Sequence, residues 1–365
     1  MKIDCVQTKL AGALRRAERV SGKNTTLPIL SAVLLEVKGG QLFVRATNLE
    51  LGVEISIPVK AEEEGIVAVS SQALSSYVSS LQGKNVTLIA EEKTLTVISE
   101  KQKATFNTFD HTDFPTIPQV SGTSVSINAE KLRVGIKSVV YSASVSSIKP
   151  ELSSVYISGN ENNELVFVAT DSFRLAEKKI SEKSVEDFDP MLIPYKNVLE
   201  IERLLEGIDN EVEVVFGESQ IAFVYDSLYV TSRVVDGSFP DYKKIIPDSS
   251  TTKVVVLKSD LIDAFKIATI FSGKFNKVTF TVDPKENKLI LETRSNEIGE
   301  NKAEVDVKAE GAPLTVDFNY RYITDAFQAI ESDSVELLFN GISRPLVLLG
   351  VGSKDFTYIV MPMNK

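Results

Sequence analysis

The spacing of apolar residues divides the first third of the chain into strands and helices. Leu10, Leu14 and Val20 recur at helical spacing, which predicts an amphipathic helix over 7–24. The alternating runs that follow predict strands at 33–37, 42–46 and 53–57. Gly39-Gly40 marks a tight turn between the first two of these strands. The order then repeats with a strand at 66–69, a helix at 71–81 and strands at 86–90, 95–99 and 104–109. The pattern predicts an α+β fold built from two strand–helix–strands units.

The same order continues to the end of the chain. Helical spacing predicts four more helices, near 129–142, 196–205, 259–271 and 320–330. The predicted N-caps are Asn128, Ser259 and Asn319, whose side chains suit the free N–H groups of a first turn. Clusters of Gly, Pro, Ser and Thr predict linkers near 118–123 and 248–252.

Short apolar sequences recur at a nearly constant interval. LFVRAT, LVFVAT and LILETR begin at 42, 165 and 289, which separates them by 123 and 124 residues. VTLI, VEVVF and VELLF begin at 86, 212 and 335, and Phe-Pro occurs at 114–115 and again 125 residues later. A long shared period indicates repeated domains rather than short solenoid repeats. We therefore expect three structurally repeated domains, each made of two strand–helix–strands units, at 1–120, 124–248 and 252–365.

Composition excludes several classes of protein. Hydrophobic residues make up 43% and charged residues 25% of the 365 positions, as in ordinary globular proteins. No apolar run approaches the roughly 20 residues of a membrane helix, and the first residues do not resemble a signal peptide. A single cysteine, Cys5, and a single histidine, His111, exclude most zinc sites and histidine-based catalysis. We expect a cytoplasmic protein with no metal, no cofactor and no membrane contact.

Positive charge is concentrated on the predicted helices. Counted with their flanking residues, over 7–24, 70–84, 128–145, 195–207, 258–277 and 319–332, the six helices carry a net charge of +7. The whole chain carries −10, so that the remainder carries −17. One interpretation is that lysines simply solvate exposed helix faces. The other is a basic surface that faces a polyanion, which is how proteins bind a nucleic-acid backbone without reading sequence. Aromatic residues are not concentrated on these helices, which favours a duplex backbone over stacking on single strands.

Four motifs, spread over the whole length, resemble those of one family. They are TLPIL at 26–30, ATDSFRLA at 169–176, FPDY at 239–242 and VMPM at 360–363. With the threefold repeat, they make the chain similar to the bacterial DNA sliding clamps, the beta subunits of DNA polymerase III. The resemblance implies the DNA clamp fold, with two chains forming a homodimeric ring that has helices lining its hole and antiparallel sheets outside.

The resemblance also implies a function. Duplex DNA would pass through the ring, which would slide without sequence specificity and hold the polymerase on its template. Such a protein is a processivity factor in DNA replication and not an enzyme. The DNA-contacting residues implied are Arg15, Arg19, Lys23, Lys149 and Lys196. The implied seam between the two chains brings Ala104 and Phe106 together with Ile270 and Phe271.

The family has one peptide pocket per chain, between the second and third domains. DNA polymerase, the clamp loader and repair proteins bind it through a short linear motif. Apolar and methionine side chains would give an adaptable cleft, and Thr170, Arg174 and Asn319 would hydrogen-bond the peptide. An ordinary final strand with a proline bend is the other interpretation of VMPM. The implied pocket residues are Leu152, Thr170, Ser172, Phe173, Arg174, Leu175, Pro240, Lys244, Ile245, Phe275, Asn319, Tyr322, Ile342, Val360, Met361, Pro362 and Met363.

Two other classes of function compete with this interpretation. The sequence DHTD at 110–113 has an acid–base composition but lies in a polar loop, and GVG at 350–352 lacks the strand-to-helix context of a dinucleotide loop. No GxxxxGK[ST] sequence for nucleotide hydrolysis is present. The remaining alternative is an oligomeric scaffold that binds peptides but not DNA. The positive charge of the helices argues against it.

Overall fold

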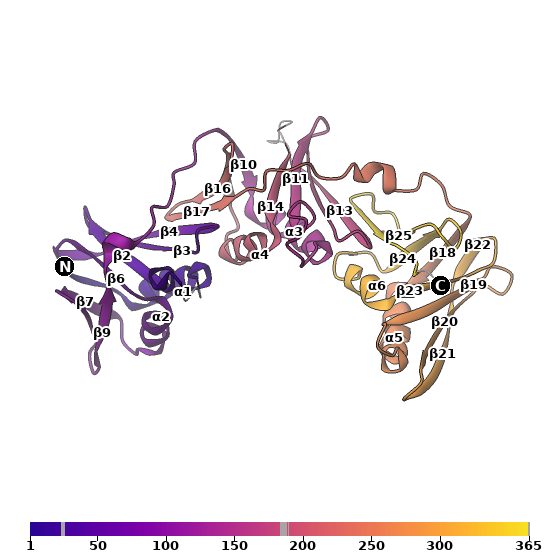
Figure 1. The fold of residues 1–365 in the computed structure, drawn as a ribbon, viewed down its shortest axis with the longest axis horizontal. Helices are drawn as coiled ribbons and strands as arrows, with labels where there is room; N and C mark the ends of the chain where they lie inside the picture. Colours follow the sequence, from indigo (N-terminus) through magenta and orange to yellow (C-terminus); the bar gives the residue numbers. More distant parts are fainter. Residues whose placement is uncertain (23–25, 183–187, 189, 364–365) are drawn as a thin grey trace. The chain divides into compact units, whose positions relative to one another are not determined.

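A computed structural model describes residues 1–22, 26–182, 188 and 190–363. These residues form an α+β fold whose helices follow the predicted order (Figure 1). Two of the predicted helices end in a short 3₁₀ turn, at Val140–Ser142 and Thr269–Phe271. The α-helices are α1 (Gln7–Val20), α2 (Ser71–Ser80), α3 (Ala129–Val139), α4 (Tyr195–Leu204), α5 (Lys258–Ala268) and α6 (Tyr320–Ala326).

The strands agree closely with the predicted alternation in the first third of the chain, and every recorded pairing is antiparallel. The short exposed strand β5 was not predicted, because its sequence KAEE has no apolar alternation. The strands are β1 (Lys2–Val6), β2 (Ala32–Lys38), β3 (Gln41–Thr47), β4 (Leu51–Pro58), β5 (Lys60–Glu63), β6 (Gly65–Ser70), β7 (Asn85–Glu91), β8 (Thr94–Ile98), β9 (Lys103–Phe109), β10 (Thr123–Asn128), β11 (Ser154–Asn160), β12 (Glu164–Thr170), β13 (Arg174–Ser181), β14 (Met191–Pro194), β15 (Glu211–Phe216), β16 (Gln220–Tyr225), β17 (Leu228–Arg233), β18 (Thr252–Leu257), β19 (Lys277–Asp283), β20 (Lys288–Ser295), β21 (Gly299–Asp306), β22 (Lys308–Gly311), β23 (Leu314–Asn319), β24 (Ser334–Phe339), β25 (Leu346–Gly350) and β26 (Phe356–Val360).

The structure divides into two compact units. The first comprises 1–130 and 199–234, and we call it unit 1. Its strands form one 13-stranded sheet in the order β10-β15-β16-β17-β4-β3-β2-β6-β9-β8-β7-β1-β5. Helices α1 and α2 lie side by side within this unit (Figure 1). The buried face of α1 carries Leu10, Leu14 and Val20, all at 0% exposure, which confirms the predicted apolar stripe.

The second unit, unit 2, comprises 131–198 and 235–365. It contains a nine-stranded sheet in the order β14-β11-β12-β13-β26-β25-β24-β18-β22 and a four-stranded sheet in the order β21-β20-β19-β23. Helices α5 and α6 contact each other within it. The recurring apolar sequences occupy equivalent strands, since LFVRAT, LVFVAT and LILETR lie in the second strand of a hairpin: β3, β12 and β20.

Helix caps were predicted with mixed success. The Asn319 side chain accepts a hydrogen bond from the N–H of Arg321 at 3.0 Å and caps α6, as predicted. The prediction for Ser259 was wrong, because α5 begins one residue earlier, at Lys258. The Lys258 N–H donates to the carbonyl of Asp333, just before β24, at 2.8 Å, so a segment distant in sequence satisfies the first N–H of the helix, and no side chain caps it. Ser70, at the end of β6, caps α2.

The chain's single cysteine lies in the core. Cys5 is buried in β1, and its thiol lies 3.6 Å from the carbonyl oxygen of Val86. Burial, and to a smaller extent the charge of Asp4, raises the pKa of Cys5 to about 12. None of the helices in the described part of the chain combines the length and apolar character that a membrane crossing requires.

Candidate functional site

The turn between β12 and β13 is held by its own side chains. The Thr170 hydroxyl donates to the carbonyl of Arg174 at 2.7 Å and accepts from the N–H of Ser172 at 3.1 Å. The Asp171 carboxylate accepts from the N–H groups of Phe173 and Arg174 at 2.9 and 3.0 Å. Ser172 has a φ of 76°, in the left-handed region. These bonds fix a tight turn that leaves Phe173 59% exposed.

Arg174 is fully engaged within unit 2. Its guanidinium bonds Asp171 at 3.0 Å and Asp325 of α6 at 2.5 Å. The same group lies 4.7 Å from the ring centre of Tyr322 and 5.9 Å from that of Tyr141. Burial lowers the pKa of Arg174, but Tyr358, Asp325 and Asp171 outweigh burial, so the pKa is raised above its ordinary value. Arg174 therefore ties the turn to α6.

The end of the chain runs alongside this turn. Strand β26 pairs with β13 in a register that places Val360 opposite Arg174 and Ile359 opposite Leu175. The Met361 N–H then donates to the carbonyl of Phe173 at 2.8 Å, and the Met363 N–H donates to that of Asp317 at 2.8 Å. Val360 thus ends the final strand, and the residues after it are hydrogen-bonded to the turn and to β23. Met361, Pro362 and Met363 are all half-buried.

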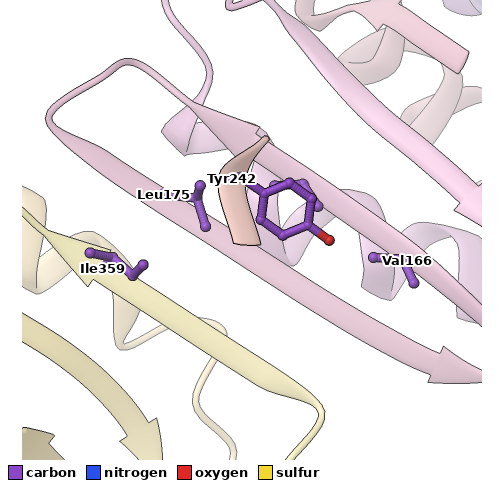
Figure 2. Close-up of a cluster of buried hydrophobic side chains, with 5 residues drawn as sticks. Val166, Leu175, Tyr242 and Ile359 are labelled. Atoms are coloured by element: carbon purple, nitrogen blue, oxygen red, sulfur yellow. The ribbon is translucent and has the colours of Figure 1, made fainter. Parts of the chain in front are cut away.

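An apolar cluster lies on the strands next to the turn. Leu175, Ile359, Val166 and Val168 pack with Tyr242, which follows the Phe-Pro pair at 239–240 (Figure 2). The Tyr242 hydroxyl donates to the buried carboxylate of Glu177 at 2.7 Å. Burial, followed by the charge of Glu177, raises the pKa of Tyr242 above its ordinary value. The FPDY motif therefore anchors the segment that carries Pro240, Lys244 and Ile245.

Several of the predicted pocket residues are apolar and exposed. The ring of Phe173 is stacked on that of Tyr322, with centroids 6.4 Å apart and an interplanar angle of 20°. Phe275 is 79% exposed, and its neighbour Asn276 accepts a bond from the N–H of Tyr320 at 2.8 Å, which places it beside α6. Ile342 is 62% exposed, and Ile245 is also exposed. Exposed apolar side chains held on a rigid framework are typical of a protein-binding site.

Several predicted pocket residues have structural partners of their own. Leu152 and Leu175 are buried, and Asn319 caps α6. Lys244 is exposed and pairs with Asp241 at 2.7 Å. Sequence reasoning missed Tyr141 and Asp325, which hold Arg174. Asp325 follows Tyr322 by three residues on α6, and this spacing was the available signal.

The predicted DNA-contacting residues are exposed where the structure describes them. Arg15 and Arg19 lie on the open face of α1, and Lys196 lies on α4. Lys149 is exposed in the segment before β11. Lys23 lies outside the described residues.

The predicted seam residues lie on strand β9 and in the 3₁₀ turn that follows α5. Ala104 and Phe106 lie on β9, whose residues 103–107 pair with β8, whereas only Thr108 and Phe109 pair with β6. Phe106 is half-buried and meets the ring of Tyr77 edge-on at 5.5 Å. Ile270 is 60% exposed, and Phe271 is half-buried beside it. Ile267 of α5 and Ile298, just before β21, are exposed as well.

The acid–base alternative has a structural explanation. The Asp110 carboxylate accepts from the N–H of Thr112 at 3.0 Å and from its hydroxyl at 2.6 Å, which caps a 3₁₀ turn at His111–Asp113. These bonds lower the pKa of Asp110. All four residues of 110–113 are exposed and form no enclosed site. The GVG sequence lies at a hairpin turn after β25, without a helix.

A repeated α+β fold with basic helices and an exposed apolar site has the features of a DNA sliding clamp. Comparison with known families supports this class along the whole chain. The models for the N-terminal, central and C-terminal domains of the DNA polymerase III beta subunit match residues 1–118, 126–241 and 243–364. The chain belongs to the DNA polymerase III beta subunit family, the bacterial beta sliding clamps.

Individual relatives agree with this assignment. The beta sliding clamp of Staphylococcus aureus is 27% identical over 351 residues, which cover 93% of each chain. That of Synechocystis is 27% identical over 390 residues, covering 100% of this chain and 99% of the relative. A crystal structure of the DNA polymerase III subunit beta from Pseudomonas aeruginosa has a TM-score of 0.94 at 28% identity, with 100% of both chains covered.

The fold is therefore the three-domain α+β sliding clamp fold, as the sequence predicted. Members of the family are processivity factors that work with DNA and a DNA polymerase, and they are not enzymes.

Proposed function

We propose that two copies of this chain close into a ring that encircles duplex DNA and slides along it in the cytoplasm. The three domains would occupy 1–120, 124–248 and 252–365. The observation that carries the proposal is the match of three consecutive family domains over nearly the whole chain. A closed ring needs little binding energy at any single contact, because topology prevents escape. That is how a chain with a net charge of −10 can hold a polyanion.

The test of encirclement uses DNA topology. Clamps loaded by the cognate clamp loader onto nicked circular DNA should be lost when the circle is linearised. Retention on the circle and loss from the linear form would be measured by gel filtration of labelled protein. Equal retention on both forms would contradict encirclement. Small-angle X-ray scattering would independently report whether the mass is that of two chains and whether the particle has a central hole.

Arg15, Arg19, Lys23, Lys149 and Lys196 are assigned to DNA contact in this proposal. Arg15, Arg19, Lys149 and Lys196 are exposed, which is what a screened and mobile contact with phosphates requires. Replacing Arg15 and Arg19 with Gln should weaken binding to a short duplex at low salt. The slope of log affinity against log salt should also decrease, by about 0.9 for each phosphate that is no longer neutralised. An unchanged slope would move the DNA path elsewhere on the chain.

The ring seam is assigned to two open strand edges. Residues 103–107 of β9 and the edge strand β21 each have one unpaired side among the described strands. Pairing β9 of one chain with β21 of a second copy would satisfy these backbone groups and remove an aggregation hazard. Ala104 and Phe106 would then meet Ile270 and Phe271. The exposed Ile267 and Ile298 would enlarge the apolar part of the seam.

A charge at the seam tests this assignment. Phe106→Glu should yield monomers, because it places an unpaired carboxylate in an apolar contact. Phe173→Glu, which changes an exposed aromatic residue in unit 2, is the matched control and should remain dimeric. Analytical ultracentrifugation measures the mass of both variants. A dimeric Phe106→Glu variant would exclude the proposed seam.

The apolar site around Phe173 is assigned to client proteins. DNA polymerase, the clamp loader and repair proteins would insert a short linear motif there. The support is the exposure of Phe173, Phe275, Ile245 and Ile342 around a framework fixed by hydrogen bonds. Thr170, Arg174 and Asn319 already have partners in the chain, so their role in this proposal is to hold the pocket walls in place.

Replacing Met361 and Met363 with Ala should weaken binding of a fluorescent polymerase-tail peptide at least about tenfold. The dimer should persist. Leu49→Ala, an exposed apolar change in unit 1 and outside the pocket, is the matched control. A sliding clamp from Pseudomonas aeruginosa has been crystallised bound to griselimycin, and it matches this chain at 28% identity with a TM-score of 0.94. We propose that griselimycin also binds this chain and that it competes there with the peptide. Unchanged peptide affinity in the double variant would relocate the pocket.

A further inference from the structure

A groove in unit 1 lies apart from the residues discussed so far. Its volume is about 710 Å³, within the range of about 300–1,000 Å³ that is usual for small-molecule sites. One wall is α1, and the other walls are the end of β4, the start of β3 and the β16–β17 turn. The lining residues are Thr8, Lys9, Gly12, Ala13, Arg16, Gln41, Ile55, Ser56, Ile57, Pro58, Asp226 and Ser227.

The helix wall of the groove is basic. Lys9 and Arg16 lie seven residues apart on α1 and both line the groove. Among the residues that the structure describes, neither side chain has an ion pair or hydrogen bond. Lys9 is exposed and Arg16 is half-buried. Two cations that share a concave wall without internal partners favour an anion.

The equivalent place in unit 2 has no such excess of charge. Lys131 occupies the third position of α3, as Lys9 does in α1. Its ammonium bonds the carbonyl of Ser181 at 2.8 Å and the carboxylate of Glu182 at 3.1 Å. By hairpin register Pro58 and Val59 replace Ser181 and Glu182 in unit 1, so the carboxylate is missing there. The comparison with Lys131 therefore shows that a lysine at this position of the fold can be paired. The fold itself does not explain why Lys9 has no partner among the described residues.

The remaining walls limit the type of ligand. Ala13, Ile55 and Ile57 are buried and form an apolar floor. Gln41, Ser56 and Ser227 provide neutral hydrogen-bonding groups, and Asp226 places one carboxylate on the wall opposite the helix. A β-carbon added to Gly12 would meet no atom within 4 Å, so the groove is open above this residue.

We propose that this groove binds a small phosphorylated molecule of nucleotide size. A phosphate group carries a charge of about −1.5 to −2 at neutral pH, which matches Lys9 and Arg16. An uncharged body would lie on the apolar floor, and its hydroxyl or amino groups would donate to Asp226. A rigid duplex presents phosphates but cannot place an uncharged group on the floor of the groove.

Isothermal titration of the full chain with adenosine diphosphate, inorganic phosphate and adenosine tests the proposal. Adenosine diphosphate should bind more tightly than phosphate, and adenosine should not bind. Gly12→Leu fills the open space with a better helix former, so it should block binding without unfolding α1. Lys9→Gln with Arg16→Gln should weaken binding about tenfold or more. Lys38→Gln with Lys84→Gln, an exposed pair outside the groove, should bind as the unchanged chain does.

Three results would overturn the proposal. The first is no heat of binding for adenosine diphosphate at millimolar concentration. The second is equal weakening in the Lys38/Lys84 control, which would indicate a general charge effect. The third is that substitutions at Gly12, Lys9 and Arg16 change the affinity for a short duplex but not the affinity for adenosine diphosphate. That result would make the groove part of the DNA path. Thermal melting of each variant shows whether the fold is intact.

Discussion

The turn at 47–52 in unit 1 and the turn at 170–175 in unit 2 have the same backbone but different chemistry. Thr47 donates to the carbonyl of Leu51 at 2.9 Å and accepts from the N–H of Leu49 at 3.0 Å, as Thr170 does in its own turn. Asn48 accepts from two N–H groups at 3.0 and 2.8 Å, in the place of Asp171. Leu49 has a φ of 77°, against 76° for Ser172.

The strand that runs beside each turn is also equivalent. The Arg233 N–H donates to the carbonyl of Glu50 at 2.9 Å, just as the Met361 N–H donates to that of Phe173 at 2.8 Å. By register, β17 lies beside β4 as β26 lies beside β13. The chain therefore contains two copies of one backbone framework, and only the copy in unit 2 presents exposed aromatic side chains at its turn.

The side chains explain why the two copies differ. Where unit 2 has Leu175, Tyr242 and Ile359, the equivalent residues of unit 1 are Gly52, Ile117 and Thr231. A β-carbon on Gly52 would lie 3.1 Å from Cγ2 of Ile117 and 3.2 Å from Cγ2 of Thr231. Ile117 thus packs directly over the glycine and occupies the space that a leucine side chain would need.

Charge completes the difference. Val168 of unit 2 corresponds to Arg45, which is ion-paired with Glu36 and Glu54. Glu54 itself corresponds to Glu177, which is buried under Tyr242. The comparison teaches that an exposed aromatic surface can be made or removed by a few side chains while the hydrogen-bonded backbone is conserved between repeats. Four experiments test this conclusion, from the largest expected effect to the smallest.

Leu175→Ala should lower the free energy of unfolding by about 2–5 kcal/mol, because it leaves a cavity in the apolar cluster next to the turn. Leu49→Ala, which truncates a leucine that is 46% exposed in the other turn, should change it by less than about 0.5 kcal/mol. Urea unfolding followed by circular dichroism measures both. Equal losses of unfolding free energy in the two variants would mean that both leucines are packed to a similar extent. That result would contradict the difference drawn here between the two turns.

Tyr242→Phe should lower the free energy of unfolding by about 1–3 kcal/mol at neutral pH, since Oε2 of the buried Glu177 carboxylate loses its donor and only the ion pair of Oε1 with Lys179 remains. The raised pKa of Tyr242 also predicts a dependence on pH. The unfolded chain loses the phenol proton near pH 10 and the folded chain only above it, so stability falls as pH rises beyond about 10. The variant should fall less steeply. If the unfolding free energy of the variant and of the unchanged protein falls equally steeply with pH, Tyr242 does not cause the loss of stability at alkaline pH.

Asp171→Asn should cost about 1–2 kcal/mol, because Arg174 loses one of its two carboxylate partners. Asn48→Asp makes the reverse change in the other turn, where no arginine follows, and should have an effect within about 0.5 kcal/mol of zero. Thermal melting compares the two variants. A large loss of stability in Asn48→Asp would mean that the two turns differ in backbone conformation and not only in the side chains that contact Asn48 and Asp171.

Ser172→Gly and Leu49→Gly should have the smallest effect. Both residues have positive φ, where glycine relieves strain but loses more entropy on folding. The two changes in unfolding free energy should be below about 1 kcal/mol and similar to each other. Opposite signs at the two sites, measured by the same urea titration, would contradict the equivalence of the turns.

Much of this fold could be predicted from apolar spacing. The stripe on α1 and the hairpins after it depend on local alternation, and the recurring six-residue sequences located equivalent strands. Helix ends were predicted less well, because a partner outside the helix decides them. The carbonyl of Asp333 satisfies the start of α5, and nothing near Ser259 in the sequence indicates this.

The site was predicted less completely than the fold. The resemblance identified Arg174 as a pocket residue, but its commitment to Asp325 spans 151 positions along the chain. Such a pairing follows from the fold of unit 2 and leaves no local pattern. The contrast between the two turns was also out of reach, because the sequences TNLEL and TDSFR differ at most positions and only their hydrogen bonds match.

The buried thiol of β1 has a practical consequence for labelling. Cys5 is the only cysteine in the chain, and with a pKa of about 12 it remains a protonated thiol at neutral pH. Thiolates, not thiols, react with maleimides and disulfides. A cysteine introduced at an exposed position would therefore be the single reactive one in an otherwise unaltered protein. Fluorophores or cross-linkers could then be attached at chosen positions, and distances across the assembly measured, without first removing the native residue.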